Sequence, residues 1–190
     1  MSLKVFLVGE GQHDIGRWET DEPYRAKKTE NGVLGTLAHR QVTSGWQIHD
    51  GCAYRRLPVL GVGRGLEEGE RKRFAGALQR TREAECDVLI YGRDTDGNDA
   101  RTAVLTTLRD AHVGVALAVV EPCIEGWVLE LRGDRKKKGW SKVGAQEALG
   151  SLSTPQMEAI VAAWDGKTEP LSDDLKRWLD DVKRVLSPTP

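Results

Sequence analysis

The sequence predicts an α/β domain with a mostly parallel β-sheet, helices on both faces and a C-terminal helical extension. Three short apolar runs predict buried strands, because strands covered on both faces are continuously hydrophobic rather than alternating. These runs are residues 3–8, 87–91 and 113–120. Segments with helical features separate them, which is the order expected of parallel strands joined by helical crossovers.

The segments between these strands predict further elements. Residues 46–60 are expected to be extended, with strand candidates at 52–54 and 57–60. The clearest helix is amphipathic, with Phe74 and Leu78 on one face. The expected helices cover residues 12–18, 33–42, 66–85, 100–111 and 124–131.

The end of the chain predicts two more helices. One begins at Thr154, read as the N-cap, with Pro155 at the first helical position. The other is capped by Ser172 and runs to about Leu186. We therefore assign residues 1–150 to the α/β domain and residues 151–190 to the helical extension.

The composition is that of an ordinary folded protein. Lysine and arginine number 28 against 29 acidic residues, so the net charge is -1 and any binding of nucleic acid must use a local basic patch. The three cysteines form no CxxC pair, which argues against a zinc ribbon or a disulfide framework. No apolar stretch approaches the roughly 20 residues needed to span a bilayer. We expect a cytoplasmic protein without membrane association.

Acidic residues follow each of the three predicted strands. Glu10 follows the first, Asp94 and Asp96 the second, and Glu121 and Glu125 the third. Parallel strands place their carboxyl ends at one edge of the sheet, where ligands bind in such folds. A divalent cation such as Mg²⁺ would relieve the repulsion between carboxylates gathered there. The alternative is a polar turn at residues 94–99, with Glu10 a solvated loop acid.

The order of these motifs resembles a known family. Toprim domains have a Glu-Gly after the first strand and an Asp-x-Asp after a later one. The similarity extends to a group of small bacterial Toprim-like proteins, related to the overcoming-lysogenization-defect nucleases, over residues 1 to about 150. The matching motifs are Glu10-Gly11-Gln12-His13-Asp14, Asp94-Thr95-Asp96-Gly97 and Pro122-Cys123-Ile124-Glu125-Gly126-Trp127.

The resemblance implies hydrolysis of phosphodiester bonds with Mg²⁺ or Mn²⁺, as in a nuclease of phage defence or DNA repair. It implies that Glu10, Asp94 and Asp96 are catalytic. The implied metal ligands are Glu10, Asp14, Asp94, Asp96 and Glu125. The chain departs from the larger nucleases in lacking an attached ATPase and an obvious lysine after the acids. The alternative is a non-catalytic module that binds metal, nucleic acid or a partner protein.

One dense basic run offers a contact for DNA or RNA. It comprises Arg135, Lys136, Lys137 and Lys138, with Trp140 nearby as a stacking surface. The alternative is a solvated surface loop.

The Asp94–Gly97 motif also has two competing interpretations. It resembles the phosphatase motif of the haloacid dehalogenase superfamily, but that motif follows the first strand, whereas here about half the chain precedes it. An EF-hand is excluded, because Asp99 stands where glycine is needed and Leu105 where the bidentate glutamate is needed.

Overall fold

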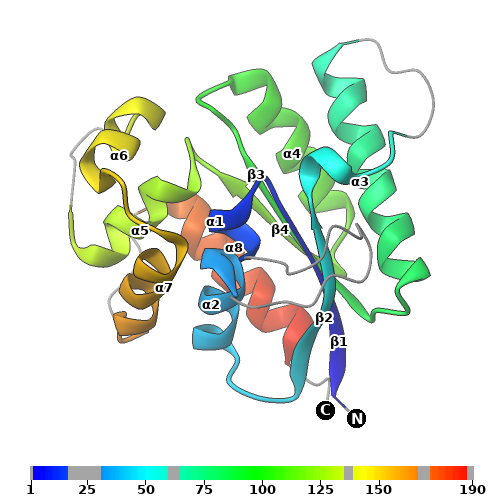
Figure 1. Cartoon of the computed structure of the whole chain (residues 1–190). Coiled ribbons are helices and arrows are strands. Elements are labelled where there is room, and N and C mark those ends of the chain that lie inside the picture. The colour runs from blue at the N-terminus through cyan, green and yellow to red at the C-terminus, as the bar shows by residue number, and fades with distance from the viewer. Residues whose placement is uncertain (1, 17–30, 60–64, 135–138, 167–171, 188–190) are drawn as a thin grey trace.

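A four-stranded parallel sheet forms the centre of the computed structural model (Figure 1). The structure describes residues 2–16, 31–59, 65–134, 139–166 and 172–187. The strand order is β2-β1-β3-β4. This confirms that the three predicted strands are neighbours in one parallel sheet. The strands are β1 (Leu3–Gly9), β2 (Trp46–Ala53), β3 (Val88–Asp94) and β4 (Val115–Val120).

The helices agree with the sequence prediction in most of their positions. They are α1 (Gln12–Ile15), α2 (Gly32–Gln41), α3 (Leu66–Glu83), α4 (Asp99–Ala111), α5 (Ile124–Arg132), α6 (Lys142–Leu149), α7 (Thr154–Ala163) and α8 (Asp173–Leu186). The predicted strand at 57–60 is wrong for residues 57–59, and Leu60 lies outside the described residues. The chain leaves β2 instead through a 3-10 turn, η1 (Tyr54–Arg56).

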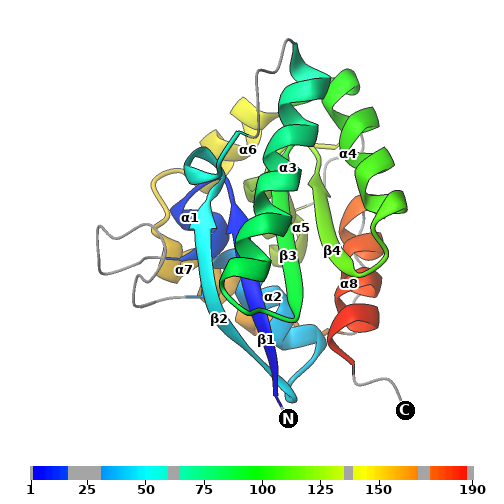
Figure 2. The ribbon, with the colours of Figure 1, turned by 90° about the vertical axis from the view of Figure 1, so that its right-hand side faces the viewer.

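The sheet separates two hydrophobic layers, because successive side chains of a strand point to opposite faces. Phe6 and Val8 of β1 face a layer covered by α3, which lies in front of the strands in Figure 2, and by α4. Val5 and Leu7 face the other layer, which α2, α5, α7 and α8 cover. Helices on both faces are thereby confirmed.

The two C-terminal helices belong to the second layer. Trp178 of α8 packs against Trp127 of α5 with ring centroids 5.5 Å apart, and both indoles are buried. The same hydrophobic cluster contains side chains from both sides of residue 150. Within the described part of the chain, no helix has both the length and the apolar character needed to cross a membrane.

The caps of these helices differ in detail from the prediction. Ser153, not Thr154, is the N-cap of α7. The backbone N–H of Ser153 donates a hydrogen bond to the Gln156 side chain at 2.8 Å. Ser172 occupies the N-cap of α8 as predicted. Its hydroxyl, however, donates to Glu130 at 2.6 Å instead of capping the helix. This contact ties the start of α8 to α5.

Candidate functional site

The carboxyl ends of β1, β3 and β4 meet at one edge of the sheet. Backbone hydrogen bonds hold the turn after β3 against the segment after β4. Thr95 donates to the carbonyl of Val120, and Asp96 donates to the carbonyl of Pro122, both at 2.9 Å. The acids that follow three different strands are therefore brought to a common region.

Asp14 folds back over the end of β1. Its Oδ2 accepts backbone hydrogen bonds from Glu10 and, at 3.1 Å, from Gly11. A Cβ atom at position 9 would lie 2.4 Å from the Cβ of Asp14, so this arrangement requires Gly9. Burial raises the pKa of Asp14 to about 7, with a further contribution from the charge of Glu125. Asp14 is thus a buried acid whose ionisation is disfavoured.

Asp94, the last residue of β3, is likewise a buried acid whose ionisation is disfavoured. Its Oδ1 accepts a hydrogen bond at 3.1 Å from the backbone N–H of Ile124, at the start of α5. Burial, and then the charges of Asp14 and Glu125, raise the pKa of Asp94 to about 8. Oε2 of Glu125 is buried and has no hydrogen-bond partner among the described residues. We call Asp14, Asp94 and Glu125 the acidic group.

Asp96 points to a different set of partners. The backbone turns sharply here, with φ of 55° at Asp96 and 69° at Gly97, so the glycine predicted to free the turn does so. The Asp96 carboxylate forms ion pairs with Arg101 and Lys142. Burial acts to raise the pKa of Asp96, but the hydrogen bonds from Lys142 and Arg101 outweigh it, and the pKa lies below its ordinary value.

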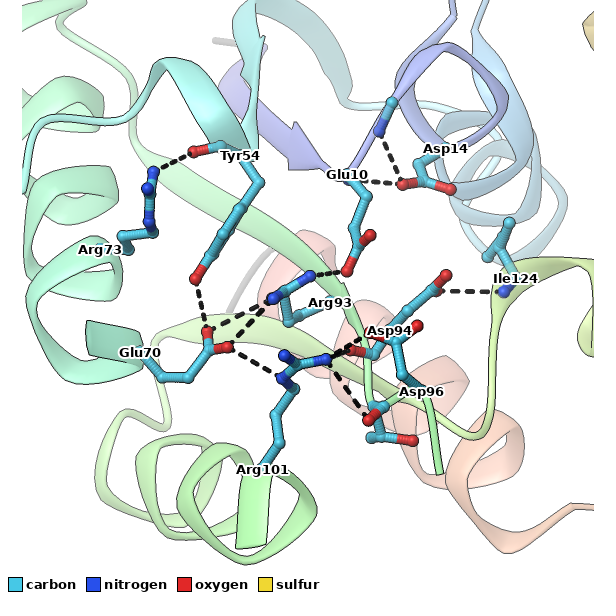
Figure 3. A network of polar contacts seen from close by, with 12 residues as sticks. Glu10, Asp14, Tyr54, Glu70, Arg73, Arg93, Asp94, Asp96, Arg101 and Ile124 are labelled. Carbon is cyan, nitrogen blue, oxygen red and sulfur yellow. Dashed lines mark hydrogen bonds and ion pairs between the residues drawn. The ribbon is translucent and has the colours of Figure 1, made fainter. Parts of the chain in front are cut away.

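Glu10 is held by an arginine rather than by the aspartates. Its carboxylate forms an ion pair with Arg93 of β3 (Figure 3). Arg93 also contacts the buried carboxylate of Glu70 at 3.1 Å, and its guanidinium lies 4.0 Å from the centre of the Tyr54 ring. Arg101 reaches the same Glu70 oxygen at 3.0 Å. We call Tyr54, Glu70, Arg93 and Arg101 the arginine network.

The predicted site residues therefore fall into two parts. Asp14, Asp94 and Glu125 interact electrostatically, whereas Glu10 and Asp96 are neutralised by cations. Within the described ranges, no group of three or more histidine, cysteine, aspartate or glutamate side chains is arranged to hold a metal ion. The predicted basic run, Arg135 to Lys138, lies outside the described residues.

The cations at this edge could not be identified from the sequence. Arg93 directly precedes Asp94, and that adjacency was the one available signal. Glu70 lies 23 residues before Arg93, and Lys142 lies 46 residues after Asp96, so no local pattern links them. Lys142 therefore lies beside Asp96, although no lysine close after the acids was evident in the sequence.

Comparison with known proteins gives no relative. No protein-family model matches the sequence, and neither the curated proteins nor the solved structures include a significant match.

Proposed function

We propose that the chain is a Mg²⁺- or Mn²⁺-dependent nuclease of the Toprim type, with the acidic group as the centre of its metal site. The observation that carries the proposal is the burial of Asp14 and Asp94, which are 5% and 7% exposed. Asp14 lies in α1, directly after β1, and Asp94 ends β3, and the charge of Asp14 adds to the cost of ionising Asp94. No ion pair joins either of them to a lysine or arginine in the described part of the chain. A divalent cation would remove this cost.

The donor chemistry of the acidic group suits such an ion. Asp14 and Asp94 each use one carboxylate oxygen for backbone hydrogen bonds, so the other oxygen remains for a ligand. Mg²⁺ requires only a few carboxylate oxygens and keeps several waters. Since no coordination set is preformed, side-chain rotation of Glu125, Glu10 or Asp96 would have to complete it.

The surrounding residues suggest how the chain would support hydrolysis. A bound ion would polarise a phosphoryl oxygen and acidify a water molecule. The Glu10 side chain is 28% exposed, so its carboxylate is accessible to accept the proton of the attacking water. Lys142 would offer its ammonium group to the phosphate once Asp96 turned away from it. Nucleic acid is the proposed substrate, and phage defence or DNA repair the proposed setting, on the motif resemblance alone.

Thermal unfolding with and without MgCl₂ or MnCl₂ tests the metal site. Binding to the folded state alone raises the melting temperature by mass action. Asp94→Asn is the informative variant, because asparagine keeps an acceptor for Ile124 but removes the charge. We expect the metal to stabilise the wild type and not Asp94→Asn. An equal gain in both would contradict the proposed site.

Cleavage assays test the catalytic part. Panels of DNA and RNA are incubated with each metal, and Asp94→Asn prepared identically controls for contaminating nucleases. The carboxylates of Glu10 and Asp96 are already paired with cations and so are not free to take part in catalysis. This favours a second candidate, a non-catalytic module that binds metal or nucleic acid. Metal-dependent stabilisation without cleavage of any substrate would support this second candidate over the nuclease.

A further inference from the structure

Two guanidinium groups surround one buried carboxylate in the arginine network. The Glu70 side chain is 4% exposed, and a single oxygen of it lies 3.1 Å from Arg93 and 3.0 Å from Arg101. Its second oxygen accepts a hydrogen bond from the Tyr54 hydroxyl at 2.8 Å. Glu70 thus fixes both arginines at the carboxyl edge of the sheet.

The charges in this network balance only with help from outside it. Glu70 supplies one negative charge against the two positive charges of Arg93 and Arg101. Glu10, which pairs with Arg93, and Asp96, which is shared between Arg101 and Lys142, supply two more negative charges. These two carboxylates are more exposed than Glu70, with side chains 28% and 35% accessible. Arg93 and Arg101 are only 10% and 16% accessible, so an uncompensated charge on them would be costly.

We propose that Arg93 and Arg101, held in position by Glu70, form the binding site for a phosphate group of the substrate. The proposal rests on the proposed function, because Glu10 and Asp96 are expected to leave the arginines when they turn towards a metal. The arginines then need an anion in their place. A phosphodiester fits, because guanidinium groups bind phosphate oxygens through paired, charge-assisted hydrogen bonds.

The position of Arg93 is determined independently of Glu10. Its guanidinium stacks on Tyr54, and the backbone carbonyl of Tyr54 accepts a hydrogen bond from Arg73 at 3.0 Å. Removal of Glu10 would therefore leave Arg93 in place and facing the strand ends. This preorganisation is what a binding site for a phosphate requires, since less side-chain entropy is lost on binding.

The proposal can be tested without metal and without catalysis. In the double variant Glu10→Gln/Asp96→Asn, the two competing carboxylates lose their charge, which mimics their departure. The probe is a short fluorescent oligodeoxythymidylate in EDTA, with binding followed by anisotropy over a range of salt concentrations. We expect the double variant to bind at least about tenfold tighter than wild type, with a salt dependence steeper by about two charges.

A matched control separates this effect from a general gain in positive charge. Glu67→Gln/Glu68→Gln removes the same charge from α3, where these glutamates pair with Arg71 and Lys72 on the surface. Adding Arg93→Gln to the Glu10/Asp96 double variant should abolish its gain in affinity for the oligodeoxythymidylate. Should that combination fail to fold, Arg101→Gln on the same background makes the same prediction and keeps the Arg93–Glu70 pair.

Two outcomes would overturn the proposal. One is a double variant that binds no better than the Glu67/Glu68 control, and the other is a gain that survives loss of the arginine. Either could occur while Mg²⁺ still stabilises the wild type, so the phosphate site can fail without the metal site. Conversely, a gain in EDTA together with no metal effect on wild type would support the phosphate site and reject the metal site.

Discussion

Lys142, the first residue of α6, forms an ion pair with Asp96, which lies 46 residues earlier in the turn after β3. The lysine also lowers the pKa of Asp14 and of Asp94 through its charge. It is therefore the cation that partly offsets the acidic group in the metal-free protein. A divalent ion entering this site would have to compete with it.

Replacement of Lys142 should strengthen metal binding. In Lys142→Gln the competing positive charge is gone, and a charge near the surface contributes about 1 kcal/mol at this range, or roughly fivefold in affinity. We expect half-maximal thermal stabilisation at a correspondingly lower Mg²⁺ concentration. Lys183→Gln, an exposed lysine of α8, serves as the control and should behave as wild type. A Lys142→Gln protein that needs more Mg²⁺ than wild type would contradict the competition.

The metal-free protein should lose stability as the pH rises. The pKa of Asp14 is about 7 and that of Asp94 about 8 in the folded state, against an ordinary 3.8. The folded state therefore keeps protons that the unfolded chain has released, so the free energy of unfolding falls between about pH 4 and pH 8. Melting temperatures in EDTA across this range measure the effect.

Asp94→Asn should flatten that decline, because the amide does not titrate and no longer repels Asp14. Asp110→Asn, on the exposed side of α4, is the control and should retain the wild-type slope. The interpretation fails if the wild type becomes more stable towards pH 8, or if Asp94→Asn declines as steeply as the wild type.

Neutralisation of Glu70 should be strongly destabilising. Glu70→Gln leaves Arg93 and Arg101 adjacent with one fewer counter-charge in a buried location, and breaking a buried ion pair costs about 3 to 5 kcal/mol. The free energy of unfolding is measured by urea denaturation. Glu68→Gln on the same helix removes a surface pair with Lys72 and should cost less than about 1 kcal/mol. Similar losses in the two variants would show that Glu70 is not the centre of the network.

Helix α8 should unfold together with the sheet. Trp178→Ala removes an indole that is 1% exposed between α5 and β4, and such truncations cost about 3 to 5 kcal/mol. We expect one cooperative transition, shifted as a whole, by circular dichroism and by amide exchange of β4. Lys183→Ala on the exposed face should have little effect. Loss of α8 alone, with exchange in β4 unchanged, would instead indicate that residues 151–190 are an independent extension.

The strands and most helices could be predicted because their signals are local. The apolar runs that became β1, β3 and β4 are buried on both faces, and that requirement is visible in each run by itself. The end of β2 could not be predicted equally well. Residues 57–59 are as apolar as a strand, but Leu57 is buried beneath α3 without joining the sheet. Local propensity does not distinguish these two kinds of burial.

By itself, the sequence determined that acids follow three parallel strands and so meet at one edge of the sheet. Only the tertiary structure decided how those acids are divided. The crossover helices bring Glu70 and Arg101 to one side of β3, and the chain after α5 returns Lys142 to the other. Glu10 and Asp96 therefore face cations, while Asp14, Asp94 and Glu125 face one another. The physical reason is that charge pairing depends on distances in space, which no spacing along the chain encodes.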